Sequence, residues 1–202
     1  MKSALNHERL VVDRIQESVA VKRALLENGT FLTLVADVAR VIVKSLRESG
    51  TVFFFGNGGS AADAQHLAAE LTGRYLRERP GLRGMALTTN TSCLTGIGND
   101  YGYDLVFARQ LQAMGSAGDV AIGISTSGNS ASVLRAVEAA KEKQLITVGM
   151  TGTNGGKLKP LVDYCLCMAS EQTARIQEGH ILIGHILCEI VEEELFNDGR
   201  IS

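Results

Sequence analysis

The sequence contains no tryptophan and only two prolines, and it has no marked excess of charge of either sign. Its 20 basic and 22 acidic side chains leave a net charge of −2, so nothing in the composition attracts it to nucleic acid or to an anionic membrane. No apolar run approaches the roughly 18 residues of a membrane-spanning helix. The N-terminal region is charged every few residues and lacks the apolar stretch of a signal peptide. We therefore expect a cytoplasmic protein with neither nucleic acid nor membrane as a partner.

Cysteine is also scarce. The four cysteines, Cys93, Cys165, Cys167 and Cys188, form no CxxC pair and have apolar neighbours. Free cysteine is among the most often buried residue types. A chain of 202 residues with 45% hydrophobic content can build a core without a disulfide framework. We expect buried, reduced thiols.

Hydrophobic periodicity predicts two helices at the N-terminus, over 5–27 and 31–48, whose apolar stripes need a partner. Continuous apolar runs beyond them predict strands that are buried on both faces, as in a parallel sheet. These runs are 52–55, 85–88, 120–124, 146–150 and 164–168. Helical segments are predicted at 60–75, 103–114, 130–143 and 171–196. The alternation favours a doubly wound α/β fold. We expect residues 1–50 to form a helical arm for oligomerisation and residues 51–202 to form the α/β domain.

The glycines gather in three turns that directly follow predicted strands, at 56–60, 125–130 and 151–156. Ligands of open α/β sheets bind at the carboxyl ends of strands, where glycine permits close approach and the next helix offers N–H groups to an anion. The second turn carries four hydroxyl side chains, Ser125, Thr126, Ser127 and Ser130. A helix N-cap with incidental serines is the alternative, but one hydroxyl suffices for a cap. The turn contains no lysine or arginine, which favours a sugar phosphate over a nucleoside triphosphate.

Two familiar nucleotide motifs are missing. No GxxxxGK[ST] sequence is present, which argues against an NTPase, and Ala61 stands where a GxGxxG motif would have its last glycine. Neither a nucleoside triphosphate nor a dinucleotide site is predicted.

Metal-binding side chains occur on two predicted helices. His66 and Glu70 are four residues apart and therefore lie about 40° apart on one helix face. The C-terminal helix carries Gln177, His180 and His185. Two imidazoles, a carboxylate and an amide oxygen could bind Zn²⁺ or a similar ion. The sequence pattern alone does not bring the two helices together, and His180 is left outside the metal set.

Several separated motifs make the chain similar to a known family. They are Gly56-Asn57-Gly58-Gly59-Ser60 with Asp63 and His66, Glu70-Leu71-Thr72-Gly73-Arg74-Tyr75, Gly98-Asn99-Asp100-Tyr101-Gly102, Gly123 to Ser130, and Arg175-Ile176-Gln177-Glu178. Their order resembles that of the sugar isomerase (SIS) domain of the phosphoheptose isomerases, over nearly the whole chain. The resemblance implies a three-layer sandwich with a five-stranded parallel sheet of the flavodoxin- or Rossmann-like kind, plus N-terminal helices.

The resemblance also implies an activity and an assembly. Members of this family convert sedoheptulose 7-phosphate to D-glycero-D-manno-heptose 7-phosphate, the first step of a heptose route to lipopolysaccharide core or related glycans. They are homotetramers with active sites between subunits and one Zn²⁺ per subunit. The implied zinc ligands are His66, Glu70, Gln177 and His185. The implied substrate contacts are Asn57, Gly58, Gly59, Glu70, Arg74, Asn99, Asp100, Ser125, Thr126, Ser127, Ser130 and Gln177.

Isomerisation of this kind moves a proton between two carbons through an enediol. The resemblance makes Glu70 the base and His185 the partner acid or base, while zinc would polarise the substrate oxygens. One relative with the same fold, the DnaA initiator-associating protein, instead assists replication and does not keep the residues that match Glu70 and His185. This chain has both, but Ala174 replaces the family's acidic residue just before Arg175, as in that relative. A non-catalytic tetramer that binds the replication initiator therefore remains the alternative.

Overall fold

Short apolar runs form a fully parallel sheet in the computed structural model, which describes residues 6–197. The strands are β1 (Val52–Gly56), β2 (Gly84–Ala86), β3 (Val120–Ile124), β4 (Ile146–Thr151) and β5 (Tyr164–Cys167). The helices are α1 (His7–Leu26), α2 (Gly29–Arg47), α3 (Gly59–Thr72), α4 (Thr91–Tyr101), α5 (Ala108–Met114), α6 (Ala131–Glu142) and α7 (Thr173–Phe196), with a 3-10 turn, η1 (Tyr103–Leu105). Residue 5 of the predicted first helix, like the rest of 1–5 and 198–202, lies outside the described residues.

The strand order is β2-β1-β3-β4-β5, and each neighbouring pair is parallel. This is the flavodoxin-like order, in which the chain reverses direction across the sheet between β1 and β3. Ligands of such folds bind outside the carboxyl ends of the strands at this switch point. The turns that follow β1 and β3 are the first two of the glycine-rich turns singled out in the sequence.

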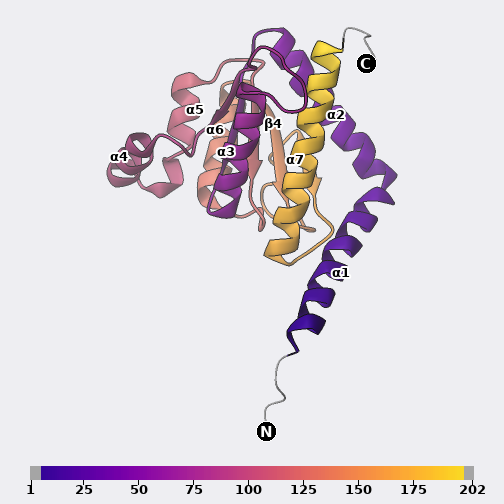
Figure 1. The fold of residues 1–202 in the computed structure, drawn as a ribbon. Coiled ribbons are helices and arrows are strands. Elements are labelled where there is room, and N and C mark those ends of the chain that lie inside the picture. The colour runs from indigo at the N-terminus through magenta and orange to yellow at the C-terminus, as the bar shows by residue number, and fades with distance from the viewer. Residues whose placement is uncertain (1–5, 198–202) are drawn as a thin grey trace.

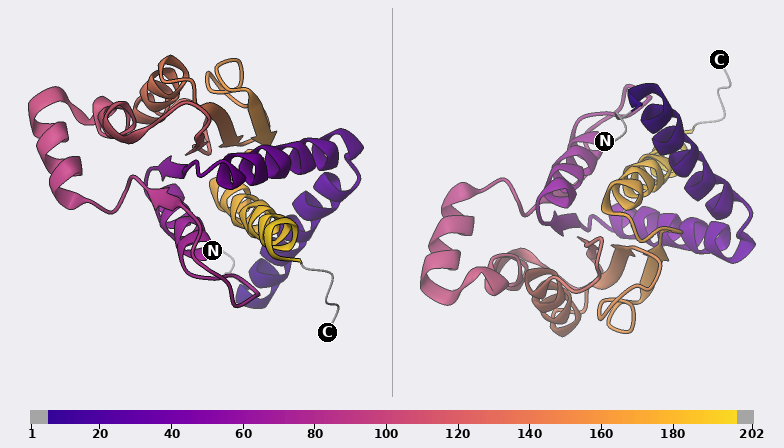
Figure 2. Two further views of the ribbon diagram at one scale, coloured as in Figure 1. Left: turned by 90° about the horizontal axis from the view of Figure 1, so that it is seen from above. Right: turned by 90° about the horizontal axis from the view of Figure 1, so that it is seen from below.

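Alternation along β1 divides the core into two layers on opposite faces of the sheet. Phe54 packs into the larger cluster with side chains of α2, α3 and α7, whereas Phe53 and Phe55 pack with side chains of α5 and α6. Figure 2 shows the sheet between these two sets of helices. The predicted three-layer α/β sandwich with a five-stranded parallel sheet is therefore confirmed.

One helix was not predicted, and one was predicted too long. The segment expected to be a single helix over 103–114 consists of η1 followed by α5, and α4 precedes it. Gly102, with a φ of +89°, separates α4 from η1. Helix α4 contains no buried residue, and only Leu94 and Ile97 pack partly against the core, which is too short an apolar stripe to predict a helix from sequence periodicity. Asn90 supplies its N-cap by accepting a hydrogen bond from the N–H of Cys93 at 3.1 Å.

The remaining predicted elements are confirmed with small shifts of their ends. The largest is at the end of α3, which stops at Thr72 rather than at 75 because Gly73 leaves the helical conformation. Helix α1 projects away from the sheet, with its N-terminal end far from the other elements (Figure 1). The division at residue 50 into an oligomerisation arm and an α/β domain stays a prediction. Within residues 6–197, no helix is both long enough and apolar enough to cross a membrane.

Candidate active site and metal centre

The loop after β3 presents its hydroxyl groups without using them as a helix cap. Ser130 occupies the N-cap position of α6, yet its side chain makes no capping hydrogen bond, and its Oγ lies 3.1 Å from Oγ of Ser125. Gly128 has a φ of +65°, and a Cβ there would fall 2.2 Å from the carbonyl oxygen of Gly155. Only glycine fits this position, which holds the second glycine-rich turn against the third. The Ser130 hydroxyl thus does not cap α6, and the anion site at this loop stays a prediction.

A hollow of about 360 Å³ opens beside this loop, between the second and third turns. Its lining residues are Thr126, Ser127, Gly152, Thr153, Asn154, Gly155, Ser170, Glu171 and Ile176. The volume is in the range of small-ligand sites, about 300–1,000 Å³. The third turn therefore forms one wall of this hollow, and Thr126 and Ser127 of the second turn lie on another.

The loop after β1 is held next to the hydroxyl loop by the side chain of Asn57. Its Nδ2 donates to Oγ of Ser132 at 3.0 Å, and its Oδ1 accepts from the Tyr103 hydroxyl at 2.8 Å. Gly58 is the N-cap of α3 and has a φ of +57°. A Cβ on Gly59 would lie 2.3 Å from Nε2 of Gln177, so this amide rests on the start of α3. These contacts bring the predicted substrate residues of two loops and of α7 to one end of the sheet.

Three predicted metal ligands converge farther along α3 and α7. The Nε2 atoms of His66 and His185 are 2.9 Å apart, and Nε2 of His66 is 3.2 Å from Oε1 of Glu70. Each residue offers one donor atom within 4.8 Å of the other two. The side chain of His66 is half exposed, whereas that of Glu70 is 21% exposed. The set is thus open to solvent on one side, as a reactive centre requires.

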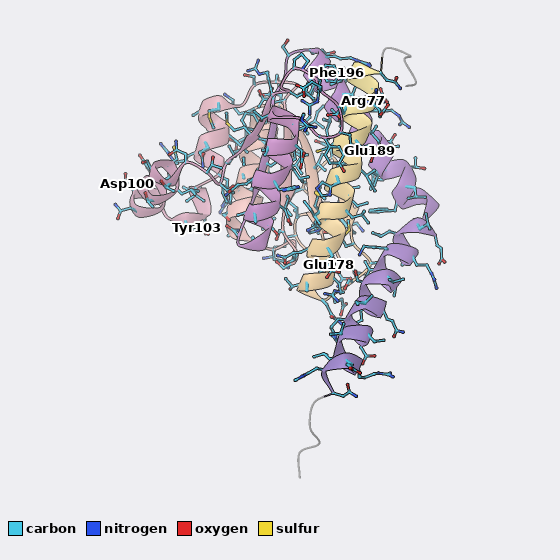
Figure 3. The ribbon with its side chains drawn as sticks, in the orientation of Figure 1. Arg77, Asp100, Tyr103, Glu178, Glu189 and Phe196 are labelled. Atoms are coloured by element: carbon cyan, nitrogen blue, oxygen red, sulfur yellow. The ribbon has the colours of Figure 1, made fainter. Side chains whose placement is uncertain are left out.

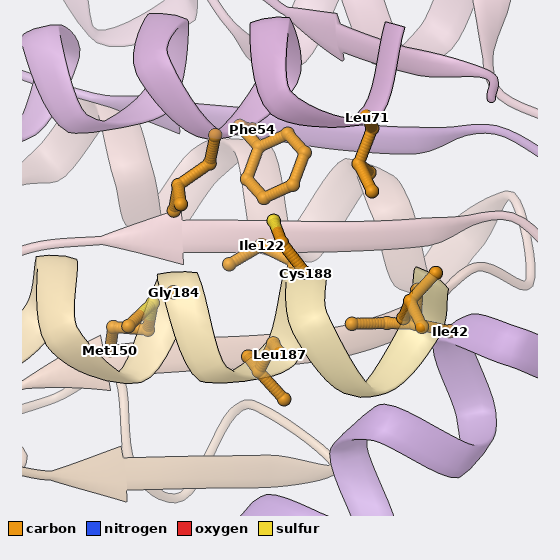
Figure 4. A pocket seen from close by; sticks show the side chains of 10 residues that line it. Ile42, Phe54, Leu71, Ile122, Met150, Gly184, Leu187 and Cys188 are labelled. Carbon is orange, nitrogen blue, oxygen red and sulfur yellow. The ribbon is translucent and has the colours of Figure 1, made fainter. Parts of the chain in front are cut away.

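A close contact between the two helices explains this convergence. A Cβ added to Gly184 would fall 2.6 Å from the methyl carbons of Leu67, and these two residues directly adjoin His185 and His66. Glycine therefore lets α7 approach α3 at the level of the site. The apolar space beneath this contact has a volume of only about 10 Å³ and is lined by Leu67, Gly184 and Cys188, among others (Figure 4). It lies within the helix–sheet packing and is not a ligand site.

The donor set fits zinc. Nitrogen and oxygen ligands lie about 2.0–2.2 Å from a zinc ion, so donors already within 4.8 Å of one another need only small rotations to enclose one. Two imidazoles and one carboxylate form the donor set of several hydrolytic zinc enzymes, which keep a further position open. Neutral imidazoles and one carboxylate leave a bound divalent ion with a net positive charge, so it could polarise a substrate oxygen.

Comparison with known proteins assigns the chain to a family. Residues 19–152 match the SIS domain. The phosphoheptose isomerase of Sulfurimonas denitrificans is 50% identical over 192 residues, which are 95% of this chain and 98% of that protein. The chain belongs to the phosphoheptose isomerase family of SIS-domain proteins. The phosphoheptose isomerase of Rhodospirillum rubrum is 58% identical over 167 residues, 83% of this chain and 89% of that relative.

Solved structures of phosphoheptose isomerases share the fold over nearly their whole length. The protein from Neisseria gonorrhoeae matches with a TM-score of 0.87 and 42% identity, over 93% of this chain and 100% of that one. The protein from Francisella tularensis matches with a TM-score of 0.90 and 33% identity, over 94% of this chain and 100% of that one. The resemblance inferred from the motifs is confirmed.

Some of the predicted site residues lie apart from the two glycine-rich loops and from the His66–Glu70–His185 set within one chain. Asn99 and Asp100 are exposed on α4, where the Asn99 amide donates to the Asp100 carboxylate at 2.8 Å. Figure 3 shows Asp100 at the opposite side of the molecule from the α7 residues Glu178 and Glu189. Arg74 is exposed too, 3.7 Å from the carboxylate of Glu78. Gln177 lies eight residues before His185 and rests on Gly59.

Sequence reasoning gave no role to two tyrosines that contact the site. Tyr75 stacks on His185 with ring centroids 5.6 Å apart, and the Tyr103 hydroxyl donates a hydrogen bond to Oδ1 of Asn57. Tyr75 stands inside a quoted motif, directly after Arg74, so its position in that motif was a usable signal. Tyr103 has no such signal, because its partner is 46 residues away in the sequence.

His180 lies outside the metal set, as predicted, and serves the core. It is fully buried, and its Nε2 donates to the carbonyl oxygen of Thr151 at 3.1 Å. Burial lowers the pKa of His180 to about 4 from its ordinary value of 6.5, although the hydrogen bond to Thr151 acts in the opposite direction. The folded protein therefore holds this imidazole neutral over a pH range in which the unfolded chain protonates it.

This difference predicts a pH-dependent stability. Between pH 6.5 and 4 the unfolded state binds more protons, so the free energy of unfolding should fall as the pH is lowered, by up to about 3 kcal/mol. Above pH 6.5 the contribution is fully present. Denaturant unfolding of the wild type and of His180→Gln at several pH values measures it. If the free energy of unfolding depended on pH equally in the wild type and in His180→Gln, the prediction would be contradicted. The control is His7→Gln, which changes a histidine at an exposed position.

The expectation of buried thiols holds only for Cys188. All four cysteines are free, but Cys93, Cys165 and Cys167 are half-buried. Cys165 and Cys167 face the same side of the edge strand β5, with Sγ atoms 3.7 Å apart. A hydrogen bond from Cys165 lowers the pKa of Cys167 to about 6 and raises that of Cys165. Apolar neighbours in the sequence did not predict the burial of Cys165 and Cys167, because adjacent residues of an edge strand face opposite sides of the sheet.

Proposed function

We propose that this chain is an aldose–ketose isomerase that converts sedoheptulose 7-phosphate to D-glycero-D-manno-heptose 7-phosphate. The observation that carries the proposal is the convergence of His66, Glu70 and His185 in a chain that belongs to the phosphoheptose isomerase family. The reaction would supply a heptose pathway to lipopolysaccharide or related glycans. None of the relatives named above supports the alternative of an initiator-binding tetramer.

In the proposed mechanism the carboxylate of Glu70 moves a proton between C1 and C2, and His185 moves a proton at the substrate oxygens. A carboxylate can serve as both metal ligand and base because it has two oxygens, one for each role. The Oε1 atom of Glu70 faces His66, so the other oxygen is the one assigned to the substrate. His185 has its Nε2 atom 2.9 Å from that of His66 and a ring nitrogen within 4.8 Å of a Glu70 carboxylate oxygen, so the two groups assigned to proton transfer lie close together.

Zn²⁺, one per subunit, is the proposed cofactor, with His66, Glu70, Gln177 and His185 as its ligands. When bound, it supplies a Lewis acid that polarises the substrate carbonyl and hydroxyl. Along one α7 helix, Gln177 and His185 are separated by about 12 Å of helical rise. We therefore assign the contribution of Gln177 to the metal set of a neighbouring subunit, while within its own chain it faces the turn at Gly59.

The phosphate of the substrate is assigned to the loop after β3. Its hydroxyl groups and the N-terminus of α6 suit an anion and do not require a basic side chain. The proposed substrate contacts are Asn57, Gly58, Gly59, Glu70, Arg74, Asn99, Asp100, Ser125, Thr126, Ser127, Ser130 and Gln177. Because Asn99 and Asp100 lie on α4 away from α7, they are assigned to a site that they complete on another subunit.

A homotetramer with active sites between subunits accounts for two exposed surfaces. Helix α1 exposes an apolar stripe in which Val12 is 47%, Ile15 58% and Val19 48% accessible to solvent. Helix α4, which carries Asn99 and Asp100, has no buried residue. Burial of apolar surface is the dominant driving force of such assemblies. The expected cytoplasmic location stays a prediction.

The stripe on α1 gives a direct test of assembly. Val12→Glu should dissociate the tetramer into smaller species at micromolar concentration, because it places a charge in an apolar contact. Light scattering coupled to size-exclusion chromatography measures the mass. Gln112→Glu adds the same charge at an exposed, polar position of α5, away from the α1 stripe, and should leave the assembly intact. A wild-type mass of one subunit, or an unchanged mass for Val12→Glu, would contradict the proposal.

The activity itself is tested with the purified, zinc-loaded protein and sedoheptulose 7-phosphate. Chromatographic separation of the two heptose phosphates follows the conversion, and fructose 6-phosphate serves as the comparison substrate. Conversion of the heptulose is the expected result. Absence of conversion, together with capture of the replication initiator by the immobilised protein, would favour the alternative function.

A further inference from the structure

The segment between α3 and β2 is anchored to α7 by one buried carboxylate. Glu192 is 2% exposed, and its oxygens accept hydrogen bonds from three consecutive backbone N–H groups. These come from Tyr75 at 3.0 Å, Leu76 at 2.7 Å and Arg77 at 2.5 Å. A fourth bond comes from Nε of Arg79 at 2.8 Å, in an ion pair whose side chains are 1% and 2% exposed. Both oxygens of the buried carboxylate are thus satisfied.

Arg79 extends this anchor to the end of α3. Its Nη2 donates to the carbonyl oxygen of Glu70 at 2.7 Å, and its Nη1 donates to that of Leu71 at 2.8 Å. Carbonyl groups in the last turn of a helix have no partner within the helix, and a basic side chain can satisfy them. Arg79 and Glu192 therefore join the last turn of α3, which carries Glu70, to α7, which carries His185. We call this pair the clamp.

The ring of Tyr75 is the part of the anchored segment that reaches the site. It stacks on the imidazole of His185, with centroids 5.6 Å apart and planes 21° apart. His66 lies edge-on to the same imidazole, with centroids 5.0 Å apart and planes 65° apart. The His185 ring is thus flanked by Tyr75 and His66.

We propose that Tyr75, held by the Arg79–Glu192 clamp, is a positioning residue that fixes the His185 imidazole in its reactive orientation. The expected effect on kcat rests on the proposed isomerase function, whereas the expected effect on zinc affinity does not. Rotation of a histidine ring about its last side-chain bond is broad and weakly restrained. A flat aromatic face removes that freedom, and a shift of about 1 Å at a reactive group can cost about 100-fold in rate.

The clamp explains how the Tyr75 ring is kept in a fixed position beside His185. A segment without helix or strand structure would otherwise move relative to α7. Three backbone bonds to one carboxylate fix the main chain at Tyr75 itself, so the ring is directed by its own backbone. The same pair fixes the end of α3, so Glu70 and the ring that orients His185 are held by one network.

The first experiment compares Tyr75→Leu with Tyr75→Phe. Tyr75→Leu keeps the backbone N–H and removes the aromatic face, so kcat for sedoheptulose 7-phosphate should fall about 10- to 100-fold with KM changed less than twofold. The zinc dissociation constant, measured by competition with a chelator, should rise about 10-fold, as for other groups that orient a metal ligand. Tyr75→Phe should restore both quantities to within about threefold of the wild type. Leu76→Ala, at an exposed neighbour with an intact backbone N–H, is the matched control.

Zinc affinity separates failure of this inference from failure of the proposed function. If the wild type does not isomerise the heptulose, the function fails, yet weaker zinc binding by Tyr75→Leu than by Tyr75→Phe still supports the positioning role. A folded Tyr75→Leu protein with wild-type zinc affinity overturns the inference. Equal impairment of Tyr75→Leu and Tyr75→Phe also overturns it, because it would assign the effect to the hydroxyl.

The second experiment addresses the clamp. Arg79→Lys keeps the charge but cannot make the guanidinium bonds to both Glu192 and the last turn of α3. The melting temperature should fall, and kcat per folded subunit should fall at least fivefold at temperatures well below the melting point. A lower melting temperature with unchanged kcat and unchanged zinc affinity would show a purely structural role and contradict the coupling between clamp and site.

Discussion

Glu70→Gln is expected to lower kcat for isomerisation of sedoheptulose 7-phosphate by about 10²–10⁴-fold, the usual contribution of a general base. The amide keeps the size and shape of the side chain but cannot accept a proton from carbon. Because Glu70 lies at the surface of α3 beside His66, with its backbone carbonyl still bonded to Arg79, the fold and the assembly should persist. Steady-state kinetics and the sedimentation profile of the variant measure the two effects.

The matched control is Glu142→Gln, which makes the same chemical change at an exposed position on α6, on the opposite face of the sheet. It should retain wild-type kcat. His185→Gln should resemble Glu70→Gln, since both side chains move protons in the same cycle. A Glu70→Gln enzyme with near-wild-type turnover would remove Glu70 from the role of base and leave it only a metal ligand.

Removal of zinc should have the second large effect. Dialysis against a chelator is expected to reduce kcat at least about 100-fold, because a Lewis acid contributes several kcal/mol to the stabilisation of developing charge. Addition of one equivalent of Zn²⁺ per subunit should restore activity. Emission spectroscopy of the metal content and the isomerase assay, run on the same samples, make the measurement.

The variant His66→Asn distinguishes loss of metal from damage by the chelator. It removes one of the three converging donors, so its zinc content should be low after purification and its activity should respond to added Zn²⁺ only at high concentration. Full activity of the chelated wild type, with less than a tenth of an equivalent of metal remaining, would contradict a catalytic role for zinc.

The sheet could be predicted because its strands are buried on both faces. A run such as Val52–Phe55 has no polar alternation, and this pattern is typical of a central parallel strand. Helix α4 could not be predicted in the same way, since it buries no side chain. Its apolar residues Leu94 and Ile97 are only partly covered. A helix that contacts the core through only two partly buried side chains leaves little periodic signal in the sequence.

The individual residues of the site could be predicted from the sequence, but the contact that brings α3 and α7 together could not. Spacing placed His66 and Glu70 on one helix face, and the hydroxyls of the second turn indicated an anion site. What joins α3 to α7 is the absence of a side chain at Gly184, which no local pattern signals. The ion pair between Arg79 and Glu192 spans 113 residues of sequence, and Arg79 stands in a segment that carries several other charged residues. Contacts of this range follow from tertiary packing alone.

The contact between Gly184 and Leu67 limits how this chain can vary. A single added methyl group at position 184 would overlap the Leu67 side chain, and the neighbouring space of about 10 Å³ is too small to take up the displaced atoms. Substitutions at these two distant positions should therefore be tolerated in pairs, with a larger residue at one requiring a smaller residue at the other. A mutational library of the two positions would show this as epistasis, in which each single change is harmful and their combination is accepted.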